Sequence, residues 1–189
     1  DFKRVFFRSS QLFCLEAMIR YSSQGGKKNG MQAFPSGQPA PAPAYLYADF
    51  KSQAKFNYLM VPILAKFGWN LGPSSPLRLY VDAGPFFGFL LNAKQVTSGS
   101  SPVFADEGGT QQVSPGPQSF DKTTDIKDQL NTFNFGVSGN VGLAYLFGRS
   151  QLFIEGGGNY GFLNIQKGTA NGKNNTGAAT ASIGYAYRI

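Results

Sequence analysis

Strict alternation of hydrophobic and polar residues is clearest from Leu77 to Lys94. Every second residue from Leu77 to Ala93 is hydrophobic or proline, whereas the positions between them carry charges, glycines and a few large rings. Because successive side chains of a strand point to opposite faces, this segment is predicted to be a strand with one hydrophobic and one polar face. A membrane-spanning strand needs only about 9–11 residues, so the segment is long enough to cross a bilayer and to continue beyond it.

Six further segments are predicted to be strands from the same alternation. They are residues 2–8, 12–22, 45–69, 133–147, 152–165 and 179–189. Along the chain, short connections between strands alternate with longer ones. The two longest connections, 25–44 and 95–124, are rich in Gly, Pro and Ser and are predicted to be loops. Bacterial single-chain barrels have even strand numbers, so seven strands indicate either that an N-terminal strand is missing or that residues 45–69 form two strands.

Short turns at one end and long loops at the other are typical of an outer-membrane barrel, in which the short turns are periplasmic. The chain is therefore predicted to be all-β, an antiparallel up-and-down transmembrane β-barrel formed as a single domain by residues 1–189. The C-terminus is expected in the periplasm and the long loops outside the cell. Aromatic residues near the short turns are expected to form an interfacial girdle, namely Phe67, Trp69, Tyr145, Phe147, Tyr185 and Tyr187.

The hydrophobic faces of the predicted strands are expected to contact lipid. The predicted lipid-facing residues are Leu59, Val61, Ile63, Leu79, Val81, Phe87, Phe89, Phe135, Val137, Val141 and Ile183. A soluble barrel would instead place its hydrophobic face inside, and its outer face would be dense in Lys and Glu. Here the second face carries mostly Gly, Asn, Ser and isolated charges, which suit a narrow lumen filled by side chains.

A polar cluster is predicted inside this lumen, where buried charges need partners and are expected to neutralise one another. Its members are Glu16, Arg20, Lys66, Arg78, Asp82, Asn140, Glu155, Asn159 and Arg188.

The amino-acid composition argues against a typical soluble domain and against an enzyme. Charged residues are 14% of the chain, against about 25% in typical soluble domains. The sequence contains no histidine, which removes the commonest general base and any Ser-His or Cys-His nucleophile pair. Cys14 is the single cysteine and cannot form a disulfide within the chain. We therefore expect no enzymatic activity, no cofactor and no metal site.

The net charge of +7 comes from lysines and arginines that are scattered along the chain, so a nucleic-acid partner is not expected. Lysines at or beyond the outer ends of strands are candidates for contact with lipopolysaccharide phosphates, although general solvation is the favoured explanation of them. These residues are Lys27, Lys28, Lys51, Lys55, Lys167 and Lys173.

Five segments resemble the small outer-membrane β-barrel family that includes the PorT-type proteins of the type IX secretion machinery. They are residues 12–28, 57–67, 79–94, 125–145 and 152–165. The resemblance implies eight antiparallel strands, of which the first and most of the second are missing here. Met60 stands where the family often has an acid, and Gly157 where a basic residue is common, which weakens the implied charge pairing in the lumen.

The last residues, SIGYAYRI, resemble the sorting signal read by the barrel-assembly machinery. The residues that carry this resemblance are Gly184, Tyr185, Tyr187 and Ile189, the last in place of the usual final aromatic. An ordinary alternating last strand accounts for most of the same residues.

The predicted function is that of a small integral protein of the bacterial outer membrane, acting as a non-enzymatic structural or accessory subunit of an envelope complex. The resemblance to PorT-type proteins suggests a secretion complex. The alternatives are a barrel that binds a surface ligand or lipopolysaccharide through long extracellular loops, and, less favoured because the lumen is filled, a narrow porin. The expected partners are outer-membrane lipid, lipopolysaccharide and other envelope proteins.

Overall fold

The computed structural model describes residues 4–8, 12–39, 41–168 and 172–187, and its main sheet is antiparallel. Seven strands follow one another across this sheet in chain order, as predicted. They are β1 (Arg4–Arg8), β2 (Phe13–Met18), β6 (Lys51–Asn70), β7 (Leu77–Ser98), β11 (Phe133–Phe147), β12 (Ser150–Gly161) and β13 (Gly177–Tyr187). The predicted fold class is thereby confirmed at the level of an all-β, up-and-down antiparallel arrangement.

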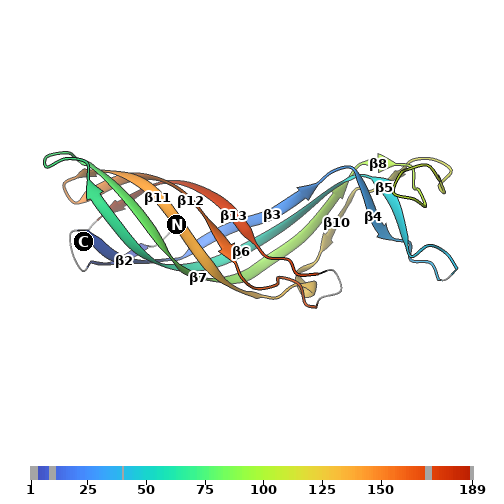
Figure 1. The fold of residues 1–189 in the computed structure, drawn as a ribbon, viewed down its shortest axis with the longest axis horizontal. Coiled ribbons are helices and arrows are strands. Elements are labelled where there is room, and N and C mark those ends of the chain that lie inside the picture. The colour runs from blue at the N-terminus through green and yellow to red at the C-terminus, as the bar shows by residue number, and fades with distance from the viewer. Residues whose placement is uncertain (1–3, 9–11, 40, 169–171, 188–189) are drawn as a thin grey trace. The chain divides into compact units, whose positions relative to one another are not determined.

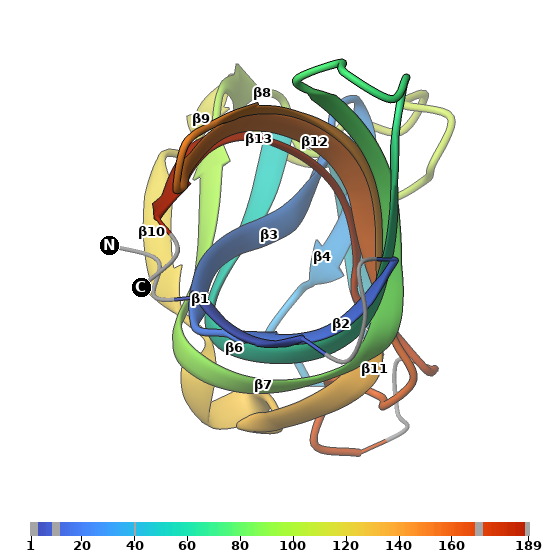
Figure 2. The ribbon, with the colours of Figure 1, turned by 90° about the vertical axis from the view of Figure 1, so that its left-hand side faces the viewer.

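Two further strands extend the sheet beside its longest members. β3 (Arg20–Lys28) pairs with β6, and β10 (Lys122–Asp125) pairs with β7. Within unit 1, as defined below, the strands of this sheet curl around a common axis (Figures 1 and 2). Over the residues that the structure describes, no hydrogen-bonded pairing joins β13 to β1, so the sheet stays open between these two strands.

The connection between β11 and β12 shows how the sequence sets a tight turn. Phe147 pairs with Ser150, so only Gly148 and Arg149 lie between the strands, and not the four residues expected from the sequence. Gly148 has a φ of 60°, a left-handed conformation that glycine adopts without the steric cost that a Cβ would add.

The chain forms two compact units. Unit 1 comprises the described residues of 1–24, 57–91 and 129–189, and unit 2 comprises those of 25–56 and 92–128. β3, β6 and β7 each contribute residues to both units. The grouping of residues 1–189 into a single domain stays a prediction.

The prediction that unit 2 consists largely of loops is wrong, because strands form within it. Residues 25–44 were expected to be a loop, but β3 runs on to Lys28, and β4 (Met31–Pro35) forms a hairpin with β5 (Tyr45–Asp49). The predicted strand 45–69 consequently divides at Phe50, where the chain leaves the pairing with β4 and enters β6. This division was the second explanation offered for the strand count, although β5 joins the small hairpin and not the main sheet.

Residues 95–124 are likewise more ordered than predicted. β7 continues to Ser98, β8 (Ser100–Ser101) pairs with β9 (Gln118–Ser119), and the whole of β10 pairs with the end of β7. A 3-10 helix, η1 (Lys127–Gln129), then leads back to unit 1. The prediction failed because these short strands are held by backbone hydrogen bonds between distant segments and carry no hydrophobic alternation.

The core of unit 2 is aromatic. The rings of Phe50 and Phe120 are stacked at 4.8 Å with an interplanar angle of 9°, and Phe34 packs edge-on against both. Ala48 and Ala93 are fully buried. Unit 2 therefore has a hydrophobic interior, as a protein has in water.

Candidate functional site

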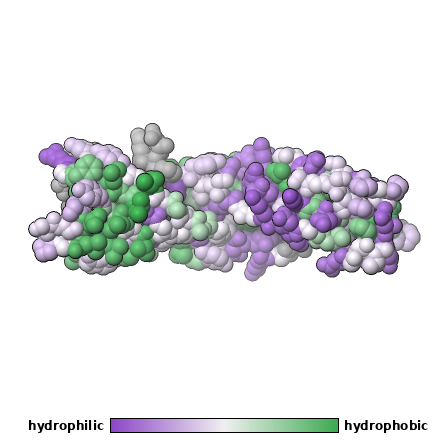
Figure 3. Space-filling view, turned by 90° about the horizontal axis from the view of Figure 1, so that it is seen from above, coloured by the Kyte–Doolittle hydropathy of each residue, from purple (hydrophilic) through white to green (hydrophobic). Residues whose placement is uncertain are grey.

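The outer face of the strands of unit 1 is hydrophobic and exposed. Val141 is 56% exposed and Ile183 is 84% exposed, and each of the eleven predicted lipid-facing residues is either exposed or half-buried. Hydrophobic surface gathers over the strands of unit 1 in the face drawn in Figure 3. A continuous exposed hydrophobic surface of this kind is uncommon on proteins that are surrounded by water.

Two bands of aromatic rings border this surface. The first is the predicted girdle near the short turns, whose members are all exposed and include the contacting pairs Tyr145–Phe147 and Phe147–Tyr185. The second band was missed from the sequence, although its motifs FFGF (86–89) and FNF (133–135) could have indicated it. It consists of Phe87, Phe89, Phe133, Phe135, Tyr160 and Phe162, which contact one another in a chain of ring pairs.

The distance between the two bands fits a membrane. Phe135 and Tyr145 lie on the same strand, at a separation of roughly 33 Å for a rise of about 3.3 Å per residue. At a tilt of roughly 40°, this length spans about 25 Å, which is the height of the hydrophobic band of outer-membrane barrels.

Inside unit 1, Lys66 is the centre of a buried charged cluster. Its Nζ lies 2.8 Å from Oε2 of Glu16 and 3.8 Å from Oδ2 of Asp82. The same ammonium group sits 3.8 Å from the centre of the Tyr80 ring. Glu16 is 0% exposed, so its charge is stabilised by these neighbours and not by water.

Glu155 forms a second centre, which Tyr80 links to the first. The Tyr80 hydroxyl donates to Oε2 of Glu155 at 2.9 Å, and Nη2 of Arg20 lies 3.6 Å from Oε1 of Glu155. Asn140 donates to Oδ1 of Asp82 at 2.6 Å. The cluster thereby joins side chains from β2, β3, β6, β7, β11 and β12, and it connects strands that are not neighbours in the sheet.

A neutral polar group lies beside the charged cluster. Nε2 of Gln24 donates to Oδ1 of Asn159 at 3.2 Å, and Asn134 donates to the hydroxyl of Thr176 at 2.7 Å. Gln24, Tyr80, Asn134 and Thr176 were not among the predicted lumen residues. Tyr80 and Asn134 occupy the inward positions of their strands, so alternation alone could have identified them.

The predicted lumen residues thus fall into three groups. Seven of them are at most 9% exposed, namely Glu16, Arg20, Lys66, Asp82, Asn140, Glu155 and Asn159. Arg78 is half-buried, and its guanidinium donates to the carbonyl of Gly68 at 3.1 Å. Arg188 lies outside the described residues.

The residues of the predicted assembly signal have ordinary structural contacts. A Cβ at Gly184 would overlap the ring of Phe153, so a larger residue there would force that ring to move. The Tyr185 hydroxyl lies 2.8 Å from the Ser150 hydroxyl, and Tyr187 is exposed. Ile189 lies outside the described residues, and the role of the motif in assembly stays a prediction.

The six lysines proposed to contact lipopolysaccharide are all exposed. Lys27 and Lys28 lie on β3, whereas Lys51 and Lys55 lie on its partner β6, so four of the six gather on two paired strands of unit 2. Lys167 and Lys173 lie in the connection between β12 and β13.

The described residues offer neither a metal-binding cluster nor a membrane-spanning helix. No cluster of three or more His, Cys, Asp or Glu side chains among them could hold a metal ion. None of the helices that they form has both the length and the hydrophobicity needed to span a membrane.

The family model described as outer membrane protein beta-barrel domain matches residues 2–167, which is most of the chain. No curated protein and no solved structure matches the chain.

Proposed function

Because the chain belongs to the outer membrane protein beta-barrel domain family, we propose that it acts as a non-enzymatic structural subunit of a complex in the cell envelope. The protein is an outer-membrane β-barrel protein. The observation that carries the proposal is the opposite polarity of its two units. Unit 1 exposes hydrophobic residues and buries charges, whereas unit 2 buries aromatic rings and exposes lysines.

The interior of unit 1 supports a structural role over a transport role. Lys66, Glu16, Asp82 and Glu155 are buried and joined by ion pairs and hydrogen bonds that cross the sheet. Side chains fixed in this way fill the space that a permeating solute would need. They also tie distant strands together, which stabilises a small barrel. The lack of histidine argues against catalysis within this network.

Unit 2 supplies the surface on which we propose that a partner protein docks. Its hairpin and short strands are ordered by the stacked rings of Phe50 and Phe120 and by backbone hydrogen bonds, such as that from Tyr47 N to Phe104 O at 2.9 Å. Ordered segments bind with a smaller entropy loss than flexible loops. In this proposal unit 2 lies outside the cell, and the short turns and the C-terminus are periplasmic. A secretion complex of the kind that contains PorT-type proteins is the partner suggested by the sequence resemblance.

Site-specific photo-crosslinking in native membranes tests this proposal. A photoreactive residue is placed at Val113 or Tyr45, which are exposed in unit 2, and at Val141 in the hydrophobic band as the matched control. We expect a single protein adduct of defined mass from the unit 2 positions and only lipid adducts from Val141. If neither unit 2 position gives a protein adduct and the protein leaves the membrane as a monomer in mild detergent, the structural role in a complex is wrong.

The lysines of β3 and β6 favour a second candidate function, the binding of lipopolysaccharide phosphates. Four exposed ammonium groups lie on two paired strands, where anionic headgroups can neutralise them. Replacing Lys27, Lys28, Lys51 and Lys55 by alanine should weaken lipopolysaccharide binding to the protein in uncharged detergent, and replacement by arginine should not. Equal affinity of the wild-type and alanine variants would remove this function.

A further inference from the structure

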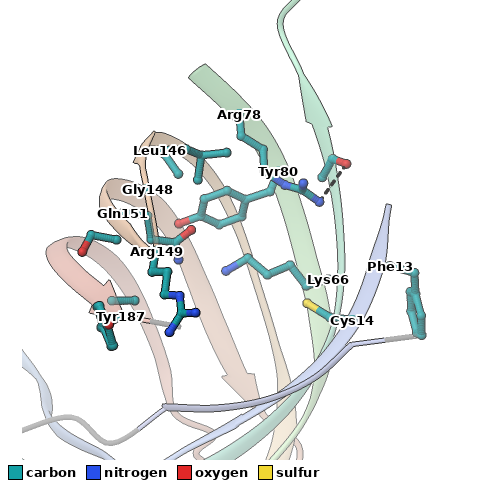
Figure 4. Close-up of a pocket in the computed structure, with 14 residues that line it drawn as sticks. Phe13, Cys14, Lys66, Arg78, Tyr80, Leu146, Gly148, Arg149, Gln151 and Tyr187 are labelled. Carbon is teal, nitrogen blue, oxygen red and sulfur yellow. Dashed lines mark hydrogen bonds between the residues drawn. The ribbon is translucent and has the colours of Figure 1, made fainter. Parts of the chain in front are cut away.

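A pocket lies at the short-turn end of unit 1. Its volume is about 310 Å³, and its walls come from the end of β6, the start of β7, the β11–β12 turn and the end of β13. Figure 4 shows Lys66 and Arg149 reaching into this space from opposite sides, with the ring of Tyr80 next to the Lys66 ammonium. The volume is at the lower end of the range for pockets that bind small molecules, about 300–1,000 Å³.

The charged side chains that line the pocket are all basic. Lys66, Arg78 and Arg149 belong to its wall, and the described lining contains no Asp or Glu. The carboxylates of Glu16 and Glu155 are buried and do not line the pocket, and Glu16 pairs with Lys66 of its wall. Arg149 is exposed and forms no ion pair with any described residue, so its guanidinium is available to a ligand.

The remainder of the wall is mostly hydrophobic. Ala144, Leu146, Ala186 and the ring of Tyr80 line the pocket together with the basic residues. A guanidinium binds carboxylate and phosphate oxygens through two parallel hydrogen bonds, whereas the hydrophobic wall favours an apolar group on the same molecule. A free inorganic ion would satisfy the first feature only.

We propose that this pocket binds a small organic anion, in which a carboxylate or phosphate meets Arg149 and Arg78 and an apolar body packs on Leu146 and Ala186. This site goes beyond the proposed docking role and does not depend on it. The ligand can be a soluble molecule or the headgroup region of an anionic lipid, because both combine the same two chemical features.

Cys14 gives a direct measurement of the potential in this pocket, because it is the single cysteine of the chain and lines the wall. Its rate of modification is measured with a negatively and a positively charged methanethiosulfonate reagent, for the protein in uncharged detergent. We expect the ratio of the anionic reagent's rate to the cationic reagent's rate to be at least tenfold higher for Cys14 than for free glutathione. The gain should shrink severalfold in Arg149→Gln, and not in Lys167→Gln, an exposed lysine outside the pocket. A ratio equal to that of glutathione would overturn the proposal.

Ligand class is tested by protection of Cys14 with phenyl phosphate, inorganic phosphate and phenol. We expect phenyl phosphate to slow modification severalfold, inorganic phosphate to do so weakly and phenol not at all. Equal protection by the two phosphates would reduce the site to an inorganic anion site and overturn the proposal for an organic ligand. Lack of protection by phenyl phosphate would also overturn it.

Two further measurements complete the test. Broadening of the ³¹P signal of phenyl phosphate by the wild-type protein, and its loss in Arg149→Gln, reports binding without any use of Cys14. Modification in nanodiscs of phosphatidylglycerol and of phosphatidylcholine then identifies the source. Slower modification in phosphatidylglycerol supports a lipid headgroup as the ligand, whereas equal rates together with protection by phenyl phosphate support a soluble anion. Equal ³¹P broadening by the wild-type protein and by Arg149→Gln would overturn the assignment of the anion to Arg149.

Discussion

Units 1 and 2 are built from the same kind of antiparallel strand, yet they distribute polarity in opposite ways. Unit 1 buries Glu16 and Lys66 and exposes Val141 and Ile183. Unit 2 buries Phe50, and its lysines are exposed. Since a side chain is stable where its surroundings match its polarity, the first unit is suited to hydrocarbon outside and the second to water outside.

The change between the two arrangements is visible within β7. Leu90 is buried and Leu91 is exposed, but the next buried residue is Ala93, so the alternation shifts by one position there. The partner strand changes at the same place, from Phe89 pairing with Phe133 of β11 to Lys94 pairing with Asp125 of β10. One continuous strand can therefore have lipid outside it in unit 1 and water outside it in unit 2, because its alternation and its partner strand change at the same place.

The largest effect is expected from breaking the charged cluster with Lys66→Met. The carboxylates of Glu16 and Asp82 would remain buried without their ammonium neighbour, and removal of one partner of a buried ion pair costs about 3–5 kcal/mol. The free energy of unfolding of the protein in lipid vesicles, obtained from urea titration, measures this loss.

The double variant Lys66→Met/Glu16→Gln is the matched control. It removes the uncompensated charge of Glu16, so we expect it to be more stable than Lys66→Met alone. If the double variant is the less stable of the two, the loss comes from packing and not from charge.

The second-largest effect is expected from an arginine introduced into the outer face of unit 1. The same substitution in unit 2 shows whether the two units have different surroundings. Val141 lies about midway between the two aromatic bands, where an arginine on the lipid face costs about 2–4 kcal/mol. Thr123→Arg places the same side chain at an exposed position of unit 2, where a change of at most about 0.5 kcal/mol is expected. Urea titration in vesicles compares the two variants. Similar losses at both positions would show that unit 1 is not surrounded by hydrocarbon.

The sequence predicted unit 1 much better than unit 2, for a physical reason. Lipid on one side and a narrow lumen on the other impose strict alternation on residues such as Val141 and Asn140, and alternation can be read without a structure. The buried charges at Glu16 and Lys66 were predictable for the same reason, because they occupy the inward positions. Their pairing was not, since the contacts depend on how the sheet curls and not on the spacing of residues along the chain.

In unit 2 the missing signal is long-range backbone pairing. β8 and β9 are two residues each, and β10 consists of Lys, Thr, Thr and Asp, so their stability comes from segments that are distant in sequence. The stacking of Phe50 on Phe120 likewise joins residues that are far apart in the chain. The pocket at the short turns was missed because Cys14, Arg78 and Arg149 approach one another only in the folded sheet.

A smaller effect is expected from Phe50→Leu in the core of unit 2. The substitution keeps most of the buried hydrophobic volume but removes the stacking on Phe120, which contributes about 0.5–1.5 kcal/mol. We expect faster hydrogen exchange at the amide of Tyr47, which bonds to Phe104 in the same unit. Phe89→Leu makes the same change on the exposed band of unit 1 and should leave the exchange at Tyr47 unchanged. Equal acceleration by both variants would mean that the two units do not unfold separately.

The smallest effect concerns Asp106, an acid of unit 2 in the connection between β8 and β9. The backbone amides of Gln111 and Thr110 donate to its carboxylate at 2.6 Å and 3.0 Å, and these bonds lower the pKa of Asp106 from its ordinary value. A carboxylate with a lowered pKa stabilises the folded loop fully above the ordinary value of about 3.9, and this contribution is lost as the pH falls through the lowered pKa.

The proton chemical shift of the Gln111 amide should therefore stay constant down to about pH 4 and change only below it. In Asp106→Asn the shift should be independent of pH over the same range, because the amide no longer bonds to a titrating group. A transition of the wild-type signal above the ordinary value would mean that the carboxylate is held in a less polar environment than the water-exposed loop assigned to unit 2. The acids of unit 2 would then resemble the buried carboxylates of unit 1, and the contrast between the two units would be restricted to their hydrophobic residues.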